Sequence, residues 1–274
     1  MDDCGRRVGI SSSGSYGGKR MNARIYVATH ERNDCVLKLK DPYIPIHCGK
    51  AIYENIYNKT GYLPEFGDNT GDNISDKNRY YSELTAMYWA WKNDESNPYD
   101  IIGLNHYRRY FGSHGSETEL MTQDEMKSIL FDEGYDFIVN GQGTDFIAYT
   151  LEEDKGIYAG YKEIHNIQDM DNAIEGIKKL FPLIANRIEY ELKHGDCGCY
   201  CNMIITTKKY FDEYCSFLFP VLEYVESKLN KDDSLEYRYN GQRVPGYIAE
   251  RLLRPWLVAT GHTAKQASEV FWDV

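Results

Sequence analysis

The sequence has no long hydrophobic run. None of its apolar stretches approaches the roughly 18 uninterrupted apolar residues that a membrane-spanning helix requires, and the longest are the length of a β-strand. Residues 1–20 also lack the apolar core of a signal peptide and are rich in Gly and Ser. Because Met21 comes directly before the first strand-like pattern, we expect residues 1–20 to be a disordered or vector-derived tail and residues 21–274 to form the domain.

The sequence also lacks an excess of positive charge. Its 31 Lys and Arg residues are outnumbered by 42 Asp and Glu residues, which gives a formal net charge of −11 at pH 7. Nucleic-acid binding and attachment to an acidic membrane surface both need a basic face, so this balance disfavours both functions. A site for an anionic ligand would therefore be a local exception in this protein.

A second pair of cysteine ligands is missing as well. Cys197, Cys199 and Cys201 lie close together, but structural zinc sites set paired ligands two to four residues apart and have a second pair elsewhere. The total of seven cysteines is odd, and a chain of 274 residues does not need disulfides to fold. We expect reduced, structural thiols in a cytoplasmic protein.

Short β-branched and aromatic runs alternate with segments of helical periodicity, which favours an α/β fold with a Rossmann-type, mixed but mostly parallel sheet flanked by helices. Thr122 and Glu125 form a capping box, Asp169 is the expected cap of another helix, and Pro220 and Pro255 are expected to kink or break theirs. Pro45 restricts its segment to an edge strand or an extended loop. The expected strands are residues 24–30, 43–49, 99–104, 135–139 and 202–206, and the expected helices are residues 78–93, 123–131, 169–181, 183–193, 208–230 and 248–258.

Residues 68–111 carry most of the chemical signals. The stretch opens with a polar loop, which is either a surface turn or a set of carboxylate and amide groups for a sugar, a ribose or a base: Asp68, Asn69, Asp72 and Asn73. An aromatic helix follows, and its rings are expected in the core rather than at a ligand. Glu83 lies on that helix, where a buried carboxylate needs a cationic partner.

Cations follow the apolar strand at residues 100–104. If the chain stays extended there, His106 and Arg108 point one way and Arg109 the other, so His106 and Arg108 would clamp a diphosphate while Arg109 makes a structural ion pair. The alternative is an ordinary basic surface patch. Thr29 and His30 end the first strand, where open α/β sheets bind ligands, although His30 also fits a surface loop.

Several motifs together resemble a bacterial family. They are residues 25–30, 68–75, 83–85, 88–93 and 106–111, followed by residues 202–205, 211–215 and 247–252. The chain resembles, from Met21 almost to its end, a domain-of-unknown-function family of capsular and exopolysaccharide gene clusters. Members of that family look like glycosyltransferases, and some are assigned galactofuranosyl transfer.

Two departures from the family pattern lie in the second half of the chain. The family usually has Gly-His-Met-Phe-Asn where this sequence has residues 198–202, Gly-Cys-Tyr-Cys-Asn, which bears on acceptor contacts. The family's Phe-Ile-Ser-Glu-Arg is replaced by Tyr-Ile-Ala-Glu-Arg at residues 247–251, which keeps the charged pair Glu250 and Arg251.

The resemblance implies a GT-A-like single domain that transfers a hexosyl, in some members galactofuranosyl, group from a UDP-sugar to an oligosaccharide or lipid-linked glycan. It would act in the cytoplasm, with the inner face of the membrane as an alternative site of contact. The sequence has no convincing Asp-x-Asp motif after a strand, so we expect metal-independent, inverting transfer, with a divalent metal as the alternative. Cations would then stabilise the leaving diphosphate: His106, Arg108 and Arg109 with Lys77. The other expected donor contacts are Thr29, His30, Asp68, Asn69, Asp72, Asn73, Glu83 and Asn202.

An inverting reaction needs a base for the acceptor hydroxyl. Glu250 is the first candidate, with Asp196 and Asp145 behind it, and the alternative for Glu250 is a salt bridge with Arg251 or Arg254. A non-catalytic nucleotide-sugar or carbohydrate binding module is the rival function. A Rossmann-type oxidoreductase is disfavoured because no Gly-x-Gly-x-x-Gly follows the first strand.

Overall fold

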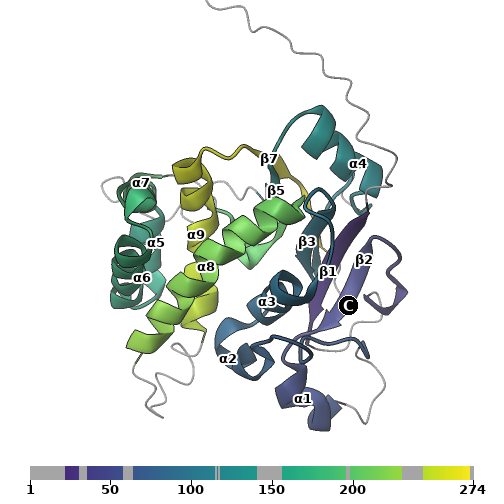
Figure 1. Ribbon diagram of the computed structural model, residues 1–274, viewed down its shortest axis with the longest axis horizontal. Helices are drawn as coiled ribbons and strands as arrows, with labels where there is room; N and C mark the ends of the chain where they lie inside the picture. The colour runs from purple at the N-terminus through teal and green to yellow at the C-terminus, as the bar shows by residue number, and fades with distance from the viewer. Residues whose placement is uncertain are drawn as a thin grey trace, which may run out of the picture.

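A computed structural model of the chain describes residues 22–30, 36–57, 64–114, 116, 118–140, 156–195, 198–229 and 243–271. These residues form one eight-stranded sheet in the order β2-β1-β3-β6-β5-β7, with β4 paired to β3 and β8 paired to β4 (Figure 1). The strands are β1 (Ala23–Thr29), β2 (Tyr43–His47), β3 (Ile101–His106), β4 (Arg109–Phe111), β5 (Phe137–Asn140), β6 (Ile204–Thr207), β7 (Ala264–Ala267) and β8 (Glu269–Phe271).

The sheet is mixed, as the alternating sequence predicts. β1 lies between β2 and β3 and is parallel to both, which confirms the expected central strand. β2 is an edge strand. Pro45 has no N–H to donate, and an edge strand tolerates this because no further strand lies on its outer side. The pairings β3–β4, β3–β6, β4–β8 and β5–β6 are antiparallel, so parallel pairing is less dominant than expected.

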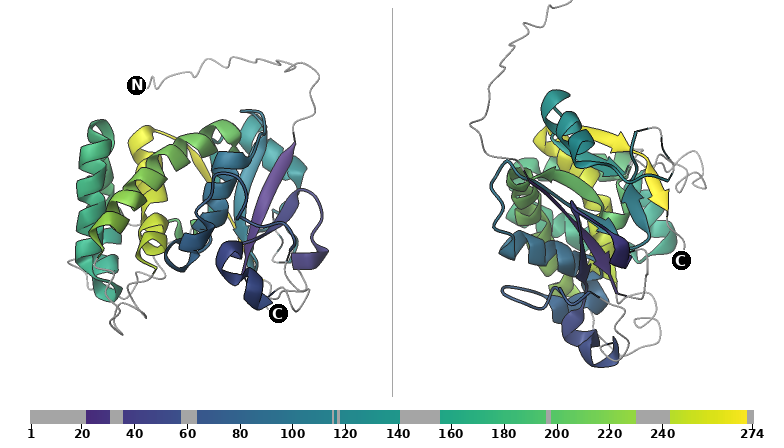
Figure 2. Two further views of the ribbon diagram at one scale, coloured as in Figure 1. Left: turned by 60° about the horizontal axis from the view of Figure 1, so that its bottom comes forward. Right: turned by 90° about the vertical axis from the view of Figure 1, so that its right-hand side faces the viewer.

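Helices cover the face of the sheet that carries the even-numbered side chains of β3. α3 (Leu84–Asn93), α8 (Lys208–Lys228) and α9 (Val244–Thr260) pack there, with the short α2 (Asn78–Tyr81) against α9. A further layer lies outside α8 and α9: α5 (Ile157–Ile164), α6 (Ile167–Leu180) and α7 (Pro182–His194) (Figures 1 and 2). α1 (Lys50–Tyr57) lies beyond the end of β2.

The other face of the sheet is covered by a smaller apolar cluster. α4 (Gln123–Lys127) continues into a π-helical turn at Ser128–Asp132, and Met126 and Leu130 from these two segments pack against Ile25 and Ile138 of the sheet. The predicted capping box is confirmed, because Thr122 accepts a hydrogen bond from the Glu125 N–H while the Glu125 carboxylate accepts one from the Thr122 N–H.

The predicted aromatic helix at residues 78–93 is two helices. Ser82 has φ 50° and ψ −128°, which no helix tolerates, and it separates α2 from α3. The Asn78 side chain and the Thr85 hydroxyl both donate to the Ser82 carbonyl, at 2.7 and 3.0 Å, so side chains replace the helical hydrogen bonds lost at the break. Glu83 follows directly and begins α3 as its N-cap residue.

Three other helix predictions need correction. Asn166, not Asp169, caps α6, through a hydrogen bond that its side chain accepts from the Gln168 N–H. Pro220 and Pro255, expected to kink or break their helices, lie inside α8 and α9 without dividing them, so neither proline breaks its helix. A proline inside a helix removes one hydrogen bond, and the dense packing of these two helices on the core outweighs that loss.

The segment after β3 also differs from the prediction. The chain does not stay extended: Tyr107 and Arg108 form a tight turn, and β4 folds back so that Arg109 lies opposite His106. His106 and Arg109 are therefore neighbours across two strands, not residues on opposite faces of one.

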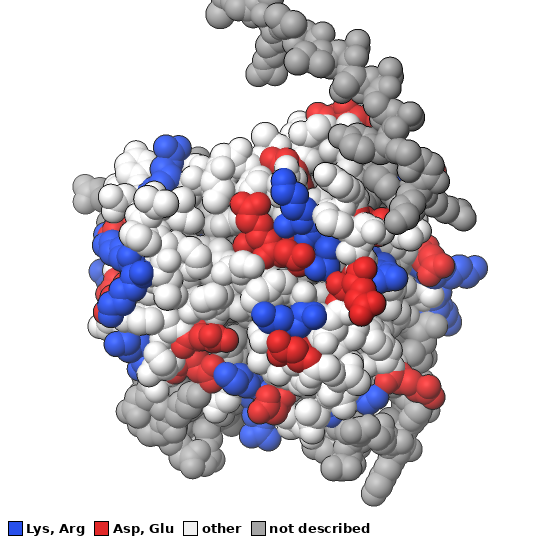
Figure 3. Space-filling view, in the orientation of Figure 1, with Lys and Arg blue, Asp and Glu red and all other residues white. Residues whose placement is uncertain are grey.

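Both signs of charge are mixed over the face seen in Figure 3, with apolar and uncharged surface between them. Among the described residues, no helix has the length and apolar character needed to cross a bilayer.

Candidate active site

A cavity of about 700 Å³ opens at the end of the sheet where β1 and β3 finish. Its walls come from both halves of the chain, namely the ends of these strands, the α2–α3 junction, the β3–β4 turn, the loop before β6 and the start of α9. The lining residues that carry polar or charged groups are His30, Tyr53, Asn78, Arg79, Ser82, Glu83, His106, Tyr107, Arg108, Arg109, Cys201, Arg243 and Glu250.

The positive and negative side chains of the cavity lie at different depths. Arg79, Arg108 and Arg243 are exposed side chains at the rim. Glu83 is 9% exposed and Glu250 is 21% exposed, so the two carboxylates lie deeper. In a protein with a net charge of −11, this rim is the local cationic site that an anionic ligand would require.

Glu83 is held by groups from three other elements. Its Oε1 accepts a hydrogen bond of 2.6 Å from the Asn202 amide and lies 3.9 Å from Nε2 of His106. Its Oε2 lies 3.8 Å from Nη2 of Arg243. The sequence-based expectation that a buried Glu83 needs cationic partners thus finds Arg243, which sequence reasoning did not consider.

Glu250 on α9 lies next to a buried cation. Its Oε2 accepts a hydrogen bond of 2.8 Å from Nη1 of Arg251, whose guanidinium also donates to the Tyr247 carbonyl at 2.9 Å. Burial raises the pKa of Glu250, and the nearby Glu83 raises it further, while Arg251 acts in the opposite direction. Glu250 therefore makes the salt bridge that the sequence allowed and still lines the cavity.

His106 ends β3 beside Glu83. Burial lowers the pKa of its imidazole, and the attraction of Glu83 offsets this only in part. The ring donates a hydrogen bond to the backbone carbonyl of Cys201, and Nε2 makes no hydrogen bond within the described residues. Burial thus favours the neutral imidazole, which weighs against the expected role of His106 as a cation for a diphosphate.

The loop before β6 joins these groups. Cys201 and Asn202 both have positive φ, 68° and 50°, an uncommon conformation for residues other than glycine. In this conformation the Cys201 backbone contacts both His106 and Glu250, and its Sγ accepts a hydrogen bond of 2.8 Å from Nη1 of Arg109. The departure from the family pattern at residue 201 therefore lies in the cavity wall.

The turn after β3 forms another part of the wall. Arg108 lies over the Tyr107 ring at 4.7 Å and donates a hydrogen bond to its hydroxyl, and His30 packs edge-to-face on the same ring at 5.2 Å. Arg109 lies over the ring of Phe271 at 5.5 Å. Both arginines and His30 line the cavity, whereas Arg109 makes no carboxylate ion pair within the described residues, contrary to its expected structural role.

Asp68 does not line the cavity and has a structural role at the start of α1. It is fully buried, its carboxylate accepts hydrogen bonds from the N–H groups of Gly49 and Lys50 at 2.8 and 3.2 Å, and the Ser75 hydroxyl donates to it as well. The carboxylate thus satisfies the free N–H groups at the start of α1.

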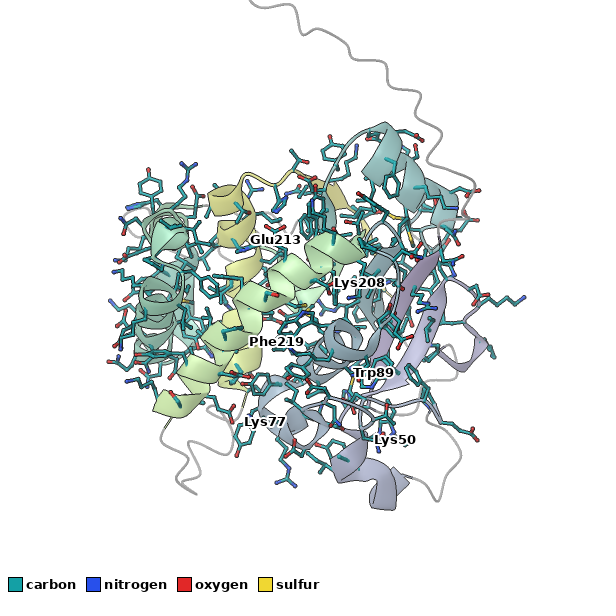
Figure 4. All side chains as sticks on the ribbon, in the orientation of Figure 1. Lys50, Lys77, Trp89, Lys208, Glu213 and Phe219 are labelled. Carbon is teal, nitrogen blue, oxygen red and sulfur yellow. The ribbon has the colours of Figure 1, made fainter. Side chains whose placement is uncertain are left out.

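The rest of the polar loop is bound to the outer side of α3. The Tyr88 hydroxyl donates to Asp72, and Asn73 bonds back to the Gly71 carbonyl within the loop. Trp89, labelled in Figure 4, donates to the Thr70 hydroxyl at 2.9 Å. Asn69, Asp72 and Asn73 are not among the described residues that line the cavity, and the surface-turn alternative describes this loop better.

Two further expected donor contacts, Lys77 and Thr29, are not among the described residues that line the cavity. Lys77 forms an ion pair of 2.9 Å with Glu226 of α8 and is labelled near the end of that helix in Figure 4. Thr29 is buried in β1, and its carbonyl accepts a hydrogen bond from the Cys48 N–H. Asn202 does not line the cavity and contacts the site through Glu83. Asp145 and Asp196, the other candidate bases, lie outside the described residues.

Metal ligands are not grouped in the described part of the chain. No cluster of three or more His, Cys, Asp and Glu side chains suited to a metal ion occurs there. Cys48, Cys199, Cys201 and Cys215 are not joined in disulfides, and Cys197 falls outside the described residues. The acidic groups that line the cavity, Glu83 and Glu250, already bond to Asn202 and Arg251, so these residues do not fit a divalent cation.

Sequence reasoning missed two of the rim arginines. Arg79 lies on α2, where the aromatic periodicity drew attention to the apolar face, and Arg243 precedes α9 by one residue. The two are far apart in the sequence and share no motif. Arg243 could have been found from its position in the sequence. It directly precedes the helix that carries Glu250, so its cation is expected near that carboxylate.

The mixed sheet, covered by helices on both faces and carrying a cation-rimmed cavity at its strand ends, is a GT-A-like α/β architecture. A similar chain is found in a solved apo structure of the bifunctional glycosyltransferase WbbM, with a TM-score of 0.72 and 27% sequence identity over 92% of this chain and 46% of that chain. This chain therefore spans about half the length of that protein.

The family follows from the sequence match. A domain of unknown function, DUF4422, matches residues 24–261, and the chain belongs to this family. No curated protein sequence matches the chain.

Proposed function

We propose that the cavity is the active site of a glycosyltransferase that moves a hexosyl group from a UDP-sugar to a hydroxyl of a glycan acceptor. The observation that carries this proposal is the combination of rim arginines and deeper carboxylates in one cavity of about 700 Å³. The fold shared with part of a bifunctional glycosyltransferase supports the same reaction class. An oligosaccharide or lipid-linked acceptor and a galactofuranosyl donor stay predictions from the family resemblance.

The arginines fit the leaving group. When the bond between the anomeric carbon and the diphosphate oxygen breaks, negative charge grows on UDP and must be stabilised in the transition state. Guanidinium groups bind phosphate oxygens through paired N–H donors and remain charged at all physiological pH values. Arg79, Arg108 and Arg243 are exposed at the rim and can reach a diphosphate lying across it.

Glu250 is the base in this proposal. The acceptor oxygen forms the new bond to the anomeric carbon, its proton passes to the Glu250 carboxylate, and UDP leaves with the electron pair of the broken bond. A carboxylate with a raised pKa accepts a proton more readily, and burial together with Glu83 provides that shift. Attack from the face opposite to the leaving group inverts the anomeric centre.

The reaction is also proposed to need no metal ion. The described residues of the cavity supply guanidinium groups, which can stabilise a leaving diphosphate as a divalent cation would, and they do not form a metal-ligand set. A chelator tests this part of the proposal separately.

The test is to incubate the protein with a panel of UDP-sugars that includes UDP-galactofuranose, with and without EDTA, and to measure release of UDP. We expect slow hydrolysis that EDTA does not abolish. The Glu250→Gln variant should lower kcat by about 10²- to 10⁴-fold, the usual contribution of a general base, while its affinity for UDP is unchanged.

Glu119→Gln is the matched control, because it removes one negative charge from an exposed residue outside the cavity. Unchanged turnover in Glu250→Gln removes Glu250 from the mechanism. Tight binding of UDP-sugars without hydrolysis or transfer would instead identify a non-catalytic nucleotide-sugar binding module.

A further inference from the structure

The depth of the charges divides the cavity into two regions of opposite character. Arg243 is 51% exposed at the rim, whereas Glu83 is 9% exposed at the floor. A nucleotide sugar also has two parts of different charge. Its anionic diphosphate would lie at the cationic rim, and its sugar would reach the carboxylates of the floor. The floor therefore restricts which sugars fit.

Glu83 has one oxygen available at the floor. Oε1 accepts the hydrogen bond from Asn202 at 2.6 Å, which fixes the orientation of the carboxylate. Oε2 lies 3.8 Å from Arg243, beyond hydrogen-bond distance, and accepts no hydrogen bond from the described residues. A buried carboxylate oxygen accepts a strong hydrogen bond from a hydroxyl group and repels another anion.

Glu250 adds a second carboxylate to the same floor. Each glutamate has a partner on the side away from the cavity, Asn202 for Glu83 and Arg251 for Glu250. The influence of Glu83 on the pKa of Glu250 shows that the two carboxylates lie close enough to interact. A third carboxylate between them would be repelled by both.

Arg109 does not reverse this character. Its guanidinium is directed to the side wall, where it donates to Sγ of Cys201 at 2.8 Å and lies over the Phe271 ring at 5.5 Å. The Nε of Arg243 donates to the Ser82 hydroxyl at 2.8 Å, which holds the guanidinium on the rim side of Glu83, with Nη2 3.8 Å from Oε2. His106 adds no compensating charge when its imidazole is neutral.

We propose that the sugar bound at this floor is neutral and carries free hydroxyl groups, and that Glu83 is the residue that determines this specificity. Oε2 of Glu83 accepts a hydrogen bond from a sugar hydroxyl, and the same charge rejects a uronic acid. This inference rests on the proposed function, because it assumes that a nucleotide sugar occupies the cavity.

The experiment compares the affinities of UDP, UDP-glucose, UDP-galactose and UDP-glucuronate by isothermal titration calorimetry at neutral pH. UDP-glucose and UDP-glucuronate differ only at carbon 6, so their ratio isolates the effect of a sugar carboxylate. We expect UDP-glucuronate to bind at least about tenfold more weakly than the two neutral UDP-sugars. In Glu83→Gln this ratio should fall toward one, and in the control Glu119→Gln it should stay as in the parent protein.

The outcomes separate the two proposals. If UDP itself does not bind, the proposed function fails and this inference fails with it. If UDP binds but UDP-glucuronate binds as tightly as UDP-glucose, only this inference is overturned. Glu83→Asp keeps the charge and should keep the discrimination, and thermal unfolding of each variant shows whether a lost affinity reflects lost structure.

Discussion

At the scale of single residues, Cys201 and Asn202 join the groups of the site. Cys201 contacts His106 and Glu250 through its backbone and Arg109 through its thiol, and Asn202 orients Glu83. The positive φ of both residues makes these contacts possible, because it turns the chain sharply just before β6. Backbone strain of this kind is retained where the surrounding contacts hold it in place.

Replacing Asn202 by Ala tests this role. The change removes the 2.6 Å hydrogen bond to Glu83 and leaves a buried carboxylate oxygen without its donor. We expect the free energy of unfolding to fall by about 1–3 kcal/mol, the cost of an unsatisfied buried polar group, as measured by urea denaturation.

A matched change on the surface provides the comparison. Asn172→Ala removes an exposed amide of α6 that accepts a bond from Gln168, and it should alter stability by less than about 0.5 kcal/mol. Equal stability losses in the two variants would show that the contact between Asn202 and Glu83 does not hold the site together.

Some site residues could be predicted from their neighbours in the sequence. His106, Arg108 and Arg109 directly follow a strongly apolar segment, so the sequence predicts that they lie at the end of a strand. Glu83 follows a polar loop and lies on an aromatic helix, which singles it out as a buried carboxylate. The polar loop was misleading, because Asp and Asn serve turns and caps as readily as sugars, and Asp68 caps α1. Arg243 approaches Glu83 only through tertiary packing.

At the scale of elements, a chain reversal and a helix break shape the cavity, and neither was predicted. The turn at Tyr107 and Arg108 returns the chain as β4, and the break at Ser82 ends α2 so that Glu83 faces the cavity. Neither position has the Gly or Pro that usually marks a turn. Sequence periodicity predicts which face of an element is buried. A turn or a helix break without Gly or Pro depends on side-chain hydrogen bonds that form only in the folded protein.

The capping box of α4 is the local element that the sequence predicted in full, and it can be tested on its own. Thr122→Ala removes the side-chain oxygen that accepts the Glu125 N–H and also loses the 2.7 Å bond from the Thr122 hydroxyl to the Glu125 carboxylate. We expect a stability loss of about 1 kcal/mol by thermal or urea unfolding.

Thr118→Ala is the control for this cap, because Thr118 is exposed and lies before the box. It should leave stability unchanged. If Thr122→Ala were as stable as this control, α4 would not depend on its cap, and its packing through Met126 and Leu130 would suffice.

At the scale of the whole molecule, the α/β class followed from alternating patterns, but the sheet order did not. β6 is antiparallel to β3 and β5, and a strand whose four residues are all buried has the same pattern in either direction. The layer of α5, α6 and α7 outside α8 and α9 was equally hidden, since periodicity identifies an apolar face without naming its partner (Figure 2).

Asp169 in that outer layer links the pH to the stability of the whole fold. It is 8% exposed in the first turn of α6, and burial raises its pKa from an ordinary 3.8 to about 6. The folded state therefore binds the proton more tightly than the unfolded state. The stability that this proton supplies is fully present below pH 3.8 and is lost as the pH rises through 6.

Asp169→Asn mimics the protonated carboxyl at every pH. We expect this variant to have a higher Tm than the parent protein above neutral pH, because the parent then has an ionised carboxylate in a buried position, and the difference should vanish in acid. Calorimetric Tm values measured from acid to mildly alkaline pH would show this convergence. Asp132→Asn, on an exposed residue, should shift Tm little at any pH. A Tm gain for Asp169→Asn that persists undiminished in acid would assign the effect to packing, since a protonated Asp and an Asn carry the same charge.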